Sequence, residues 1–167
     1  GPVIVRQWAM QGQRTTESIR IVLEWHAKFG GIMVIESGIA QASVIDAVYQ
    51  ARLEERMVLV NPGGPPIGDK EQFADRRSEL YYWAAERFKK GTIACPDVES
   101  PLGAQLTSIR KVLRGDLKFQ IERKITMAAR GMLSPDWSDS YMCTLAVSGA
   151  MVFDDAHALG LSGYGGR

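Results

Sequence analysis

The sequence predicts a mixed α/β domain, because two buried strands enclose a helix. Residues 32–35 and 57–60 are short apolar runs with β-branched members, which is typical of buried strands. Between the two runs, apolar residues recur at helical spacing, at Val44, Ala47, Val48 and Ala51. A strand, a helix and a strand in this order predict a parallel pair joined by a right-handed crossover.

A strand and a helix are expected before this unit. Residues 3–8 are apolar and β-branched, so they are predicted to form a strand. Thr15 or Thr16 can cap the helix that follows, and Gly30 ends it. The N-terminal third of the chain therefore adds one more strand and one more helix to the predicted fold.

The rest of the chain continues the mixture of helices and strands. The longest helix is predicted at residues 70–90, where apolar residues share one side and Gly91 follows. Beyond it, the pattern predicts a strand at 92–95, a basic helix at 105–113, a half-buried strand at 116–121 and a helix from Asp136 past Leu145. We expect one domain over residues 1–153 and a Gly-rich flexible tail over residues 154–167.

Composition excludes several classes of protein. The chain has 167 residues, of which 46% are hydrophobic and 23% charged, so it reads as one globular domain. No apolar run approaches the roughly 20 residues that a membrane-spanning helix needs. Cys95 and Cys143 fit neither a metal-ligand spacing nor a disulfide framework, so we expect core thiols in a reducing cytoplasm.

The net charge of +1 does not by itself indicate nucleic-acid binding, but the charge is unevenly distributed. Within residues 103–131, basic residues outnumber Asp116 and Glu122. Such an excess is found both in phosphate-facing strips and in solvated helices and turns. The basic residues are Arg110, Lys111, Arg114, Lys118, Arg123, Lys124 and Arg130.

The segment NPGGPPIGDK, residues 61–70, lies between a strand and a helix, as a phosphate-binding loop does. Its glycines Gly63 and Gly68 have the spacing of that motif. The motif requires Lys directly after the second Gly, whereas Asp69 stands there, and Pro65 and Pro66 lack N–H donors. The sequence therefore predicts a turn and no ATPase site.

Three acidic residues are candidates for metal ligands. Glu36 follows a buried strand, and Asp136 and Asp139 lie three residues apart, so they share one face of a helix. Carboxylate oxygens are the ligands that Mg²⁺ and Mn²⁺ prefer. The alternatives are a solvated Glu36 at a strand exit and a pair of aspartates that stabilise the start of a helix.

Cations and aromatic residues near these acids are open to two interpretations. Arg123 and Lys124 can hold a phosphate, although solvent-exposed basic residues are the commoner case. Tyr81, Tyr82 and Trp83 can form a stacking platform, although aromatic residues at helical spacing more often pack in a core.

From about residue 3 to residue 147, the order of motifs resembles the C-terminal nuclease domain of the large terminase subunit of tailed bacteriophages. The most specific match is residues 117–146, in which a strand and the link IERKITMAARG precede LSPDWSDSYMCTLA, similar to the family's Ser-Pro-Asp, two residues, Asp pattern. VIESGIA resembles the family's strand that ends in an acid. The family's Phe, Arg, x, Glu helix is matched by Phe73, Arg77 and Glu79.

The resemblance implies a ribonuclease H-like mixed sheet flanked by helices, and a metal-dependent endonuclease that cuts concatemeric DNA during genome packaging. Hydrolysis would use two Mg²⁺ or Mn²⁺ ions held by Glu36, Asp136 and Asp139, with Lys124 at the phosphate. Arg123, Lys124, Arg110 and Lys111 would contact double-stranded DNA. The implied partners are the portal, the small terminase subunit and the ATPase domain of the same full-length protein, in the cytoplasm of the infected bacterium.

One feature departs from the family's pattern. Relatives carry another aspartate in a Gly-x-Asp context on a strand upstream of the one that residues 3–8 resemble, and this sequence has no match for it. We therefore expect an N-terminally truncated domain. The alternative is a catalytically inactive fragment that binds DNA or another packaging protein. A third reading is a different ribonuclease H-like nuclease, such as a junction resolvase, but its resemblance does not include residues 124–136.

Overall fold

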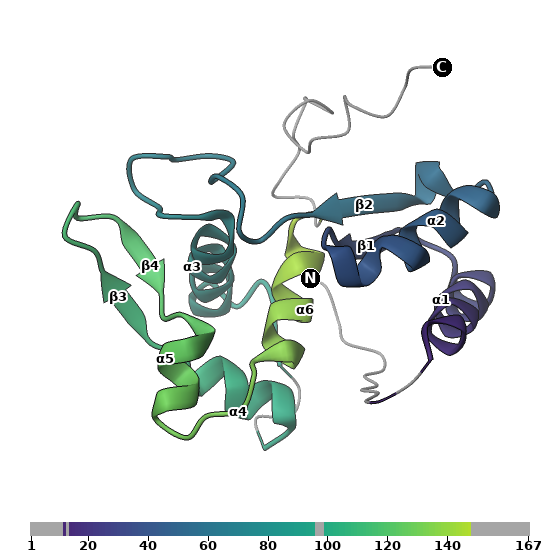
Figure 1. The fold of residues 1–167 in the computed structure, drawn as a ribbon. Coiled ribbons are helices and arrows are strands. Elements are labelled where there is room, and N and C mark those ends of the chain that lie inside the picture. Colours follow the sequence, from purple (N-terminus) through teal and green to yellow (C-terminus); the bar gives the residue numbers. More distant parts are fainter. Residues whose placement is uncertain (1–11, 13, 96–98, 148–167) are drawn as a thin grey trace. The chain divides into compact units, whose positions relative to one another are not determined.

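The structure is a computed structural model that describes residues 12, 14–95 and 99–147 (Figure 1). These residues form two compact units, residues 14–61 and residues 62–147, which are described in turn. The strand expected at residues 3–8 and the tail expected at 154–167 lie outside the described residues. No helix in the described part of the chain is long and apolar enough to cross a membrane.

The unit of residues 14–61 contains the predicted parallel pair of strands. Strand β1 (Met33–Glu36) pairs with β2 (Met57–Val60) in parallel, with Met33 opposite Met57 and Glu36 opposite Val60. The connection runs through the short 3₁₀ helix η1 (Ile39–Gln41), helix α2 (Ala42–Gln50) and η2 (Glu54–Arg56). Helix α2 buries Val48 completely. The strand, helix, strand prediction is confirmed.

Helix α1 (Thr15–Phe29) packs against α2 in the same unit. Arg14 is its N-cap and makes no side-chain capping hydrogen bond, so the predicted cap by Thr15 or Thr16 is wrong by one residue. Gly30 ends the helix with a φ of +65°, in the left-handed region that glycine adopts without a Cβ clash.

The unit of residues 62–147 is built around helix α3 (Arg76–Lys89). Figure 1 shows α3 between the hairpin of β3 (Lys111–Leu113) and β4 (Phe119–Ile121) on one side and α6 (Asp136–Leu145) on the other. Helix α4 (Pro101–Ser108) packs against α6, and α5 (Lys124–Ala129) follows the hairpin. Apolar side chains of these elements fill the core, among them Leu80, Ala84, Leu102, Met127 and Met142.

The helix predicted at residues 70–90 starts later than expected and, with 14 residues, is one residue shorter than α1, so it is not the longest helix. Helix α3 begins at Arg76, because the Asp75 carboxylate accepts the backbone N–H of Ser78 and caps the first turn. The residues before it form turns and bends, and Phe73 forms a parallel bridge with Phe119. The described strands form two two-stranded sheets, one parallel and one antiparallel.

Three further predictions after residue 90 are corrected. Residues 92–95 form no strand, although Ile93 is buried. The basic helix predicted at 105–113 is wrong: α4 ends at Ser108, and Lys111 begins β3. The predicted strand 116–121 is shortened to Phe119–Ile121, because the chain turns at Leu117, which has a φ of +66°.

Candidate functional site

The two aspartates of the predicted site lie in the first turn of α6. The side chain of Asp136 is 73% exposed, and that of Asp139 is 10% exposed. Pro135 is the N-cap residue, and neither carboxylate accepts a backbone N–H from any residue that the structure describes. Their charges suit the positive end of the helix dipole, but they form no capping hydrogen bond.

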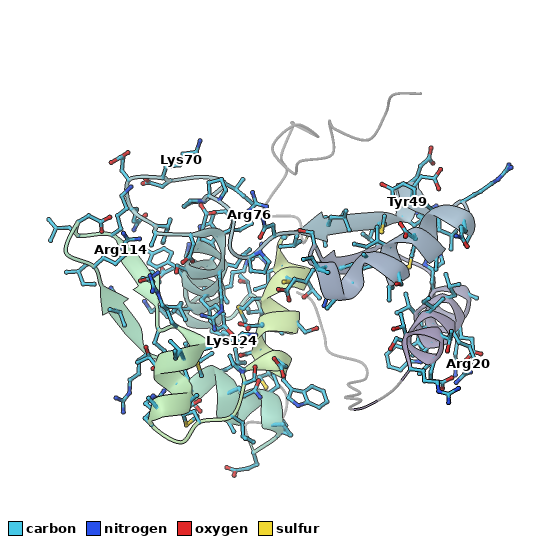
Figure 2. All side chains as sticks on the ribbon, viewed as in Figure 1. Arg20, Tyr49, Lys70, Arg76, Arg114 and Lys124 are labelled. Carbon is cyan, nitrogen blue, oxygen red and sulfur yellow. The ribbon has the colours of Figure 1, made fainter. Side chains whose placement is uncertain are left out.

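Lys124, the first residue of α5 and labelled in Figure 2, forms ion pairs with both carboxylates. Its Nζ is 3.1 Å from Oδ2 of Asp139 and 3.5 Å from Oδ1 of Asp136. Burial lowers the pKa of the ammonium, but the hydrogen bonds and charges of Asp139 and Asp136 outweigh burial and raise it. Lys124 is therefore a charged partner of both acids, which lessens their mutual repulsion.

Asp139 is fixed by two residues of α3. Its Oδ1 accepts hydrogen bonds from Nε of Arg77 at 2.8 Å and from the hydroxyl of Tyr81 at 2.9 Å. The Tyr81 hydroxyl also lies 2.6 Å from Oγ of Ser138. Burial, together with the charge of Asp139, raises the pKa of Tyr81, so its hydroxyl keeps the proton that it donates. Tyr81 is a buried support of the acid and not part of a stacking platform.

Arg77 also ties the acids to the polypeptide that leads into α5. Its Nη1 donates to the backbone carbonyl of Glu122 at 3.1 Å. The Glu122 side chain is buried, and it accepts hydrogen bonds from Nε and Nη2 of Arg130 and from the backbone N–H of Arg110. The base of the hairpin, the start of α5 and the start of α6 are thereby held in one hydrogen-bonded network.

The basic residues within residues 103–131 have different roles. Arg130 is engaged with buried Glu122, whereas Arg123 is exposed at the N-cap of α5. Arg110 is exposed directly before the hairpin, in which Nζ of Lys111 lies 4.9 Å from the Phe119 ring centroid. In the same hairpin, Arg114 pairs with Asp116, and Lys118 donates to the carbonyl of Lys70.

Glu36 lies in the unit of residues 14–61, exposed at the carboxyl end of β1. Its predicted position at the end of a strand is therefore confirmed. No group of three or more His, Cys, Asp or Glu side chains that could hold a metal ion occurs within residues 14–95 and 99–147. In the unit of residues 62–147, the described acids of the candidate site are Asp136 and Asp139.

The loop that resembled a phosphate-binding loop binds an anion of its own chain. The buried Glu79 carboxylate accepts the backbone N–H groups of Ile67 at 2.6 Å, Gly68 at 2.7 Å and Asp69 at 3.3 Å. A Cβ on Gly68 would lie 3.1 Å from this carboxylate, which is why the close approach favours glycine. These three donors of the loop are therefore used within the protein.

Glu122 predicts an acid-sensitive step in stability. The hydrogen bond from Arg130 lowers its pKa and outweighs burial, which raises it; the N–H of Arg110 acts with Arg130. The pKa of Glu122 in the folded protein therefore lies below the unfolded value of about 4.3. The charged carboxylate stabilises the folded protein above about pH 4.3, and this stabilisation is lost as the pH falls through the folded pKa. Glu122→Gln should therefore lower the melting temperature at neutral pH and flatten its decline below about pH 5. Melting curves across this range test the effect, with exposed Glu55→Gln as the control; equal slopes in wild type and E122Q would contradict it.

Comparisons with known proteins give matches to solved structures. No protein-family model and no curated protein matches the sequence. The nuclease domain of the large terminase subunit gp2 of bacterial virus Sf6 matches with 18% identity, 78% coverage of this chain, 72% of that chain and a TM-score of 0.59.

Two structures of a K428A mutant of the same domain match similarly. One contains manganese, with 17% identity, 80% coverage of this chain, 74% of that chain and a TM-score of 0.61. The other, from bacteriophage Sf6 with calcium, has 18% identity, 79% and 73% coverage and a TM-score of 0.62. At this level of identity the likeness establishes the fold: the chain has the mixed α/β fold of the Sf6 terminase nuclease domain, as the sequence predicts.

Proposed function

We propose that this chain, which has the fold of a terminase nuclease domain, is a metal-dependent DNA endonuclease that cuts concatemeric phage DNA during genome packaging. The observation that supports this most directly is the pair of carboxylates in the first turn of α6, with Lys124 between them. The fold supports it independently, because the similar Sf6 domain is described as a nuclease and has been solved with manganese and with calcium.

The donor atoms suit a hard divalent cation. Oδ2 of Asp136 has no hydrogen-bond partner among the described residues, and Oδ2 of Asp139 is held by Lys124 alone. Both oxygens are of the type that Mg²⁺ and Mn²⁺ prefer. We assign Asp136 and Asp139 as ligands, with Glu36 as the third acid that a two-metal site requires. The bound ions would lower the pKa of a water and neutralise charge on the scissile phosphate.

The protein's own side chains would orient the ligands and the substrate. Arg77 and Tyr81 hold Oδ1 of Asp139, so its Oδ2 faces a fixed direction. Lys124 stays protonated beside both acids and can move its hydrogen bonds to a phosphate oxygen when a cation occupies the carboxylates. Such positioning by rigid elements is what a hydrolytic site needs, since small displacements of reacting atoms are costly.

DNA would be bound mainly through its phosphates. We assign Arg123, Lys124, Arg110 and Lys111 to this contact; Arg110, Lys111 and Arg123 are exposed, and Lys124 lies at the acids. Contacts of this kind are independent of sequence and weaken steeply with salt. As a terminase nuclease, the domain (residues 1–153, followed by the tail 154–167) would work beside the ATPase domain of its full-length protein, the portal and the small terminase subunit, in the host cytoplasm.

The test is cleavage of supercoiled plasmid by the complete chain in Mn²⁺ or Mg²⁺. We expect nicked and linear products that disappear with a chelator, and loss of cleavage in Glu36→Ala. Asp46→Ala serves as the control, because Asp46 is an exposed acid of α2 in the same unit. Cleavage that persists in the chelator, or that is unchanged in Glu36→Ala, would contradict the proposed site.

The second candidate function is a catalytically inactive domain that binds DNA or a packaging protein. It is favoured by one observation: the ammonium of Lys124 already pairs with both Asp136 and Asp139, at the place where a metal ion would bind. It predicts that DNA is retained without being cut and that Mn²⁺ does not raise the melting temperature, whereas a metal bound to the native state raises it.

A further inference from the structure

We infer that Arg77, Arg123 and Lys124 form a pocket that binds a backbone phosphate of DNA next to the paired aspartates. The pocket has a volume of about 290 Å³ and lies in the unit of residues 62–147. It is lined by Pro62, Gly63, Asp75, Arg77, Gln120, Ile121, Arg123 and Lys124. The choice of DNA as the source of the phosphate rests on the proposed function; the pocket itself rests on the contacts given below.

The lining of the pocket is cationic. Three basic side chains face one acid, Asp75, and that acid is already satisfied within the protein. Its Oδ1 accepts hydrogen bonds from the backbone N–H and the hydroxyl of Ser78, and its Oδ2 accepts one from Nε2 of Gln120. An anion that enters the pocket therefore meets an excess of positive charge. The one acid of the lining, Asp75, already accepts hydrogen bonds at both of its oxygens.

Arg77 has hydrogen-bonding capacity that its protein contacts do not use. Nε donates to Asp139 and Nη1 to the carbonyl of Glu122, but the buried Nη2 has no hydrogen-bond partner among the described residues. Buried polar groups of proteins are nearly always paired, so an unpaired guanidinium nitrogen indicates a place for an acceptor that comes from outside. A phosphate oxygen is the acceptor that the planar guanidinium fits best.

Arg123 supplies a second cation whose charge is uncompensated. Its side chain is exposed and forms no ion pair with a described residue, in contrast to Arg130 and Arg114, which pair with Glu122 and Asp116. Lys124 completes the set and lies 3.1 Å from Asp139. The pocket thus contains one unpaired cation, one arginine with an unpaired nitrogen and one lysine shared with the acids.

This arrangement links phosphate binding to the orientation of a metal ligand. The same guanidinium that lines the pocket holds Oδ1 of Asp139, so a phosphate on Arg77 would restrain both groups together. Arg77 would be a binding residue for the phosphate and a positioning residue for Asp139. A phosphate in the pocket would therefore further restrain an acid that Arg77 and Tyr81 already hold.

The experiment measures binding of a short fluorescent DNA duplex to the complete chain in EDTA, so that cleavage does not interfere. Arg77→Lys keeps the charge but loses the planar set of donors, and we expect about tenfold weaker binding, the effect of one charge-assisted hydrogen bond. Arg123→Gln removes no protein contact, and we expect weaker binding with a salt slope smaller by about one unit. Arg56→Gln, an exposed arginine in the other unit, should bind as wild type does.

Inorganic phosphate is the second probe, and melting curves check that each variant folds. We expect phosphate to displace the duplex from wild type at lower concentrations than from Arg77→Lys. The pocket is refuted if folded Arg77→Lys and Arg123→Gln bind duplex and phosphate as Arg56→Gln does. If phosphate binding is weakened but duplex binding is not, DNA as ligand is refuted. Because no metal is present, binding that needs Arg77 without any plasmid cleavage would contradict the nuclease proposal and support the pocket.

Discussion

Asp136→Asn should reduce the Mn²⁺-dependent cleavage of plasmid by at least about 100-fold. Mutating a residue that only hydrogen-bonds to a metal ligand lowers activity by about 10- to 100-fold, and we expect the loss of a ligand itself to cost more. The substitution keeps the size of the side chain and removes the charge that binds the cation. Since the side chain is 73% exposed and caps no backbone group, the melting temperature without metal should stay nearly unchanged. Initial rates and metal-free melting curves test both parts.

Asp139→Asn should give a different combination of effects. Activity should fall comparably, but the metal-free protein should also lose stability, because Arg77 and Tyr81 are packed around this carboxylate and would lose their charged acceptor. Asp46→Asn, on the surface of α2, is the matched control for both aspartates. Full activity in Asp136→Asn would exclude Asp136 as a ligand; an unchanged melting temperature in Asp139→Asn would show that its contacts contribute no stability.

Glu79→Ala should destabilise the unit of residues 62–147 by about 3 kcal/mol, because it removes the buried carboxylate to which the loop makes charge-assisted hydrogen bonds. The carboxylate accepts three successive N–H groups, from Ile67, Gly68 and Asp69, and is completely buried. Glu79→Gln retains one carbonyl acceptor and should lose less. Urea unfolding followed by circular dichroism measures the difference.

The control for Glu79 is Glu86→Ala on the same helix. Glu86 pairs with Lys89 one turn away at the surface, so its removal should change stability little. If Glu79→Ala and Glu86→Ala unfold at the same urea concentration, the loop does not depend on the buried carboxylate. Faster proteolysis within residues 62–75 of Glu79→Ala would locate the effect in the loop.

The parallel strand pair could be predicted from sequence because its signals are local and agree with each other. The two apolar runs are too short for helices, and the segment between them has helical spacing, so the topology follows from few choices. The structure confirms both strands and places Glu36 opposite Val60 at the end of the pair. The start of α6 at Asp136 was equally local, since Ser-Pro precedes the first acidic turn.

The elements that sequence reasoning missed depend on contacts between distant residues. The segment before α3 looks helical by composition, but Asp75 caps the helix and Phe73 pairs with Phe119. The helix predicted at 105–113 instead starts earlier, because Ser100 caps α4 and Pro101 lies in its first turn, and it ends at Ser108. Those two caps were readable signals, whereas the bridge to Phe119 was not.

The acids of the candidate site could be predicted from the sequence, but the residues that hold them in place could not. Spacing placed Asp136 and Asp139 on one helical face, and the order of motifs placed Lys124 before them. The roles of Arg77 and Tyr81 required the packing of α3 on α6, which no local pattern encodes. The sequence of α3 did offer one signal, since it combines Arg, Glu and Tyr with apolar residues. Buried polar side chains need hydrogen-bond partners, so this combination indicates polar contacts with another element.

The hydrogen bonds between Glu79 and the loop that precedes α3 limit which insertions and deletions the chain can accept. Surface loops rich in proline and glycine usually accept insertions, since their backbone groups face water. Here three consecutive amides of residues 67–69 must meet one buried carboxylate of α3. Length changes should therefore be poorly accepted in this loop and better accepted at the exposed turn around Gly115, where added residues meet no such constraint.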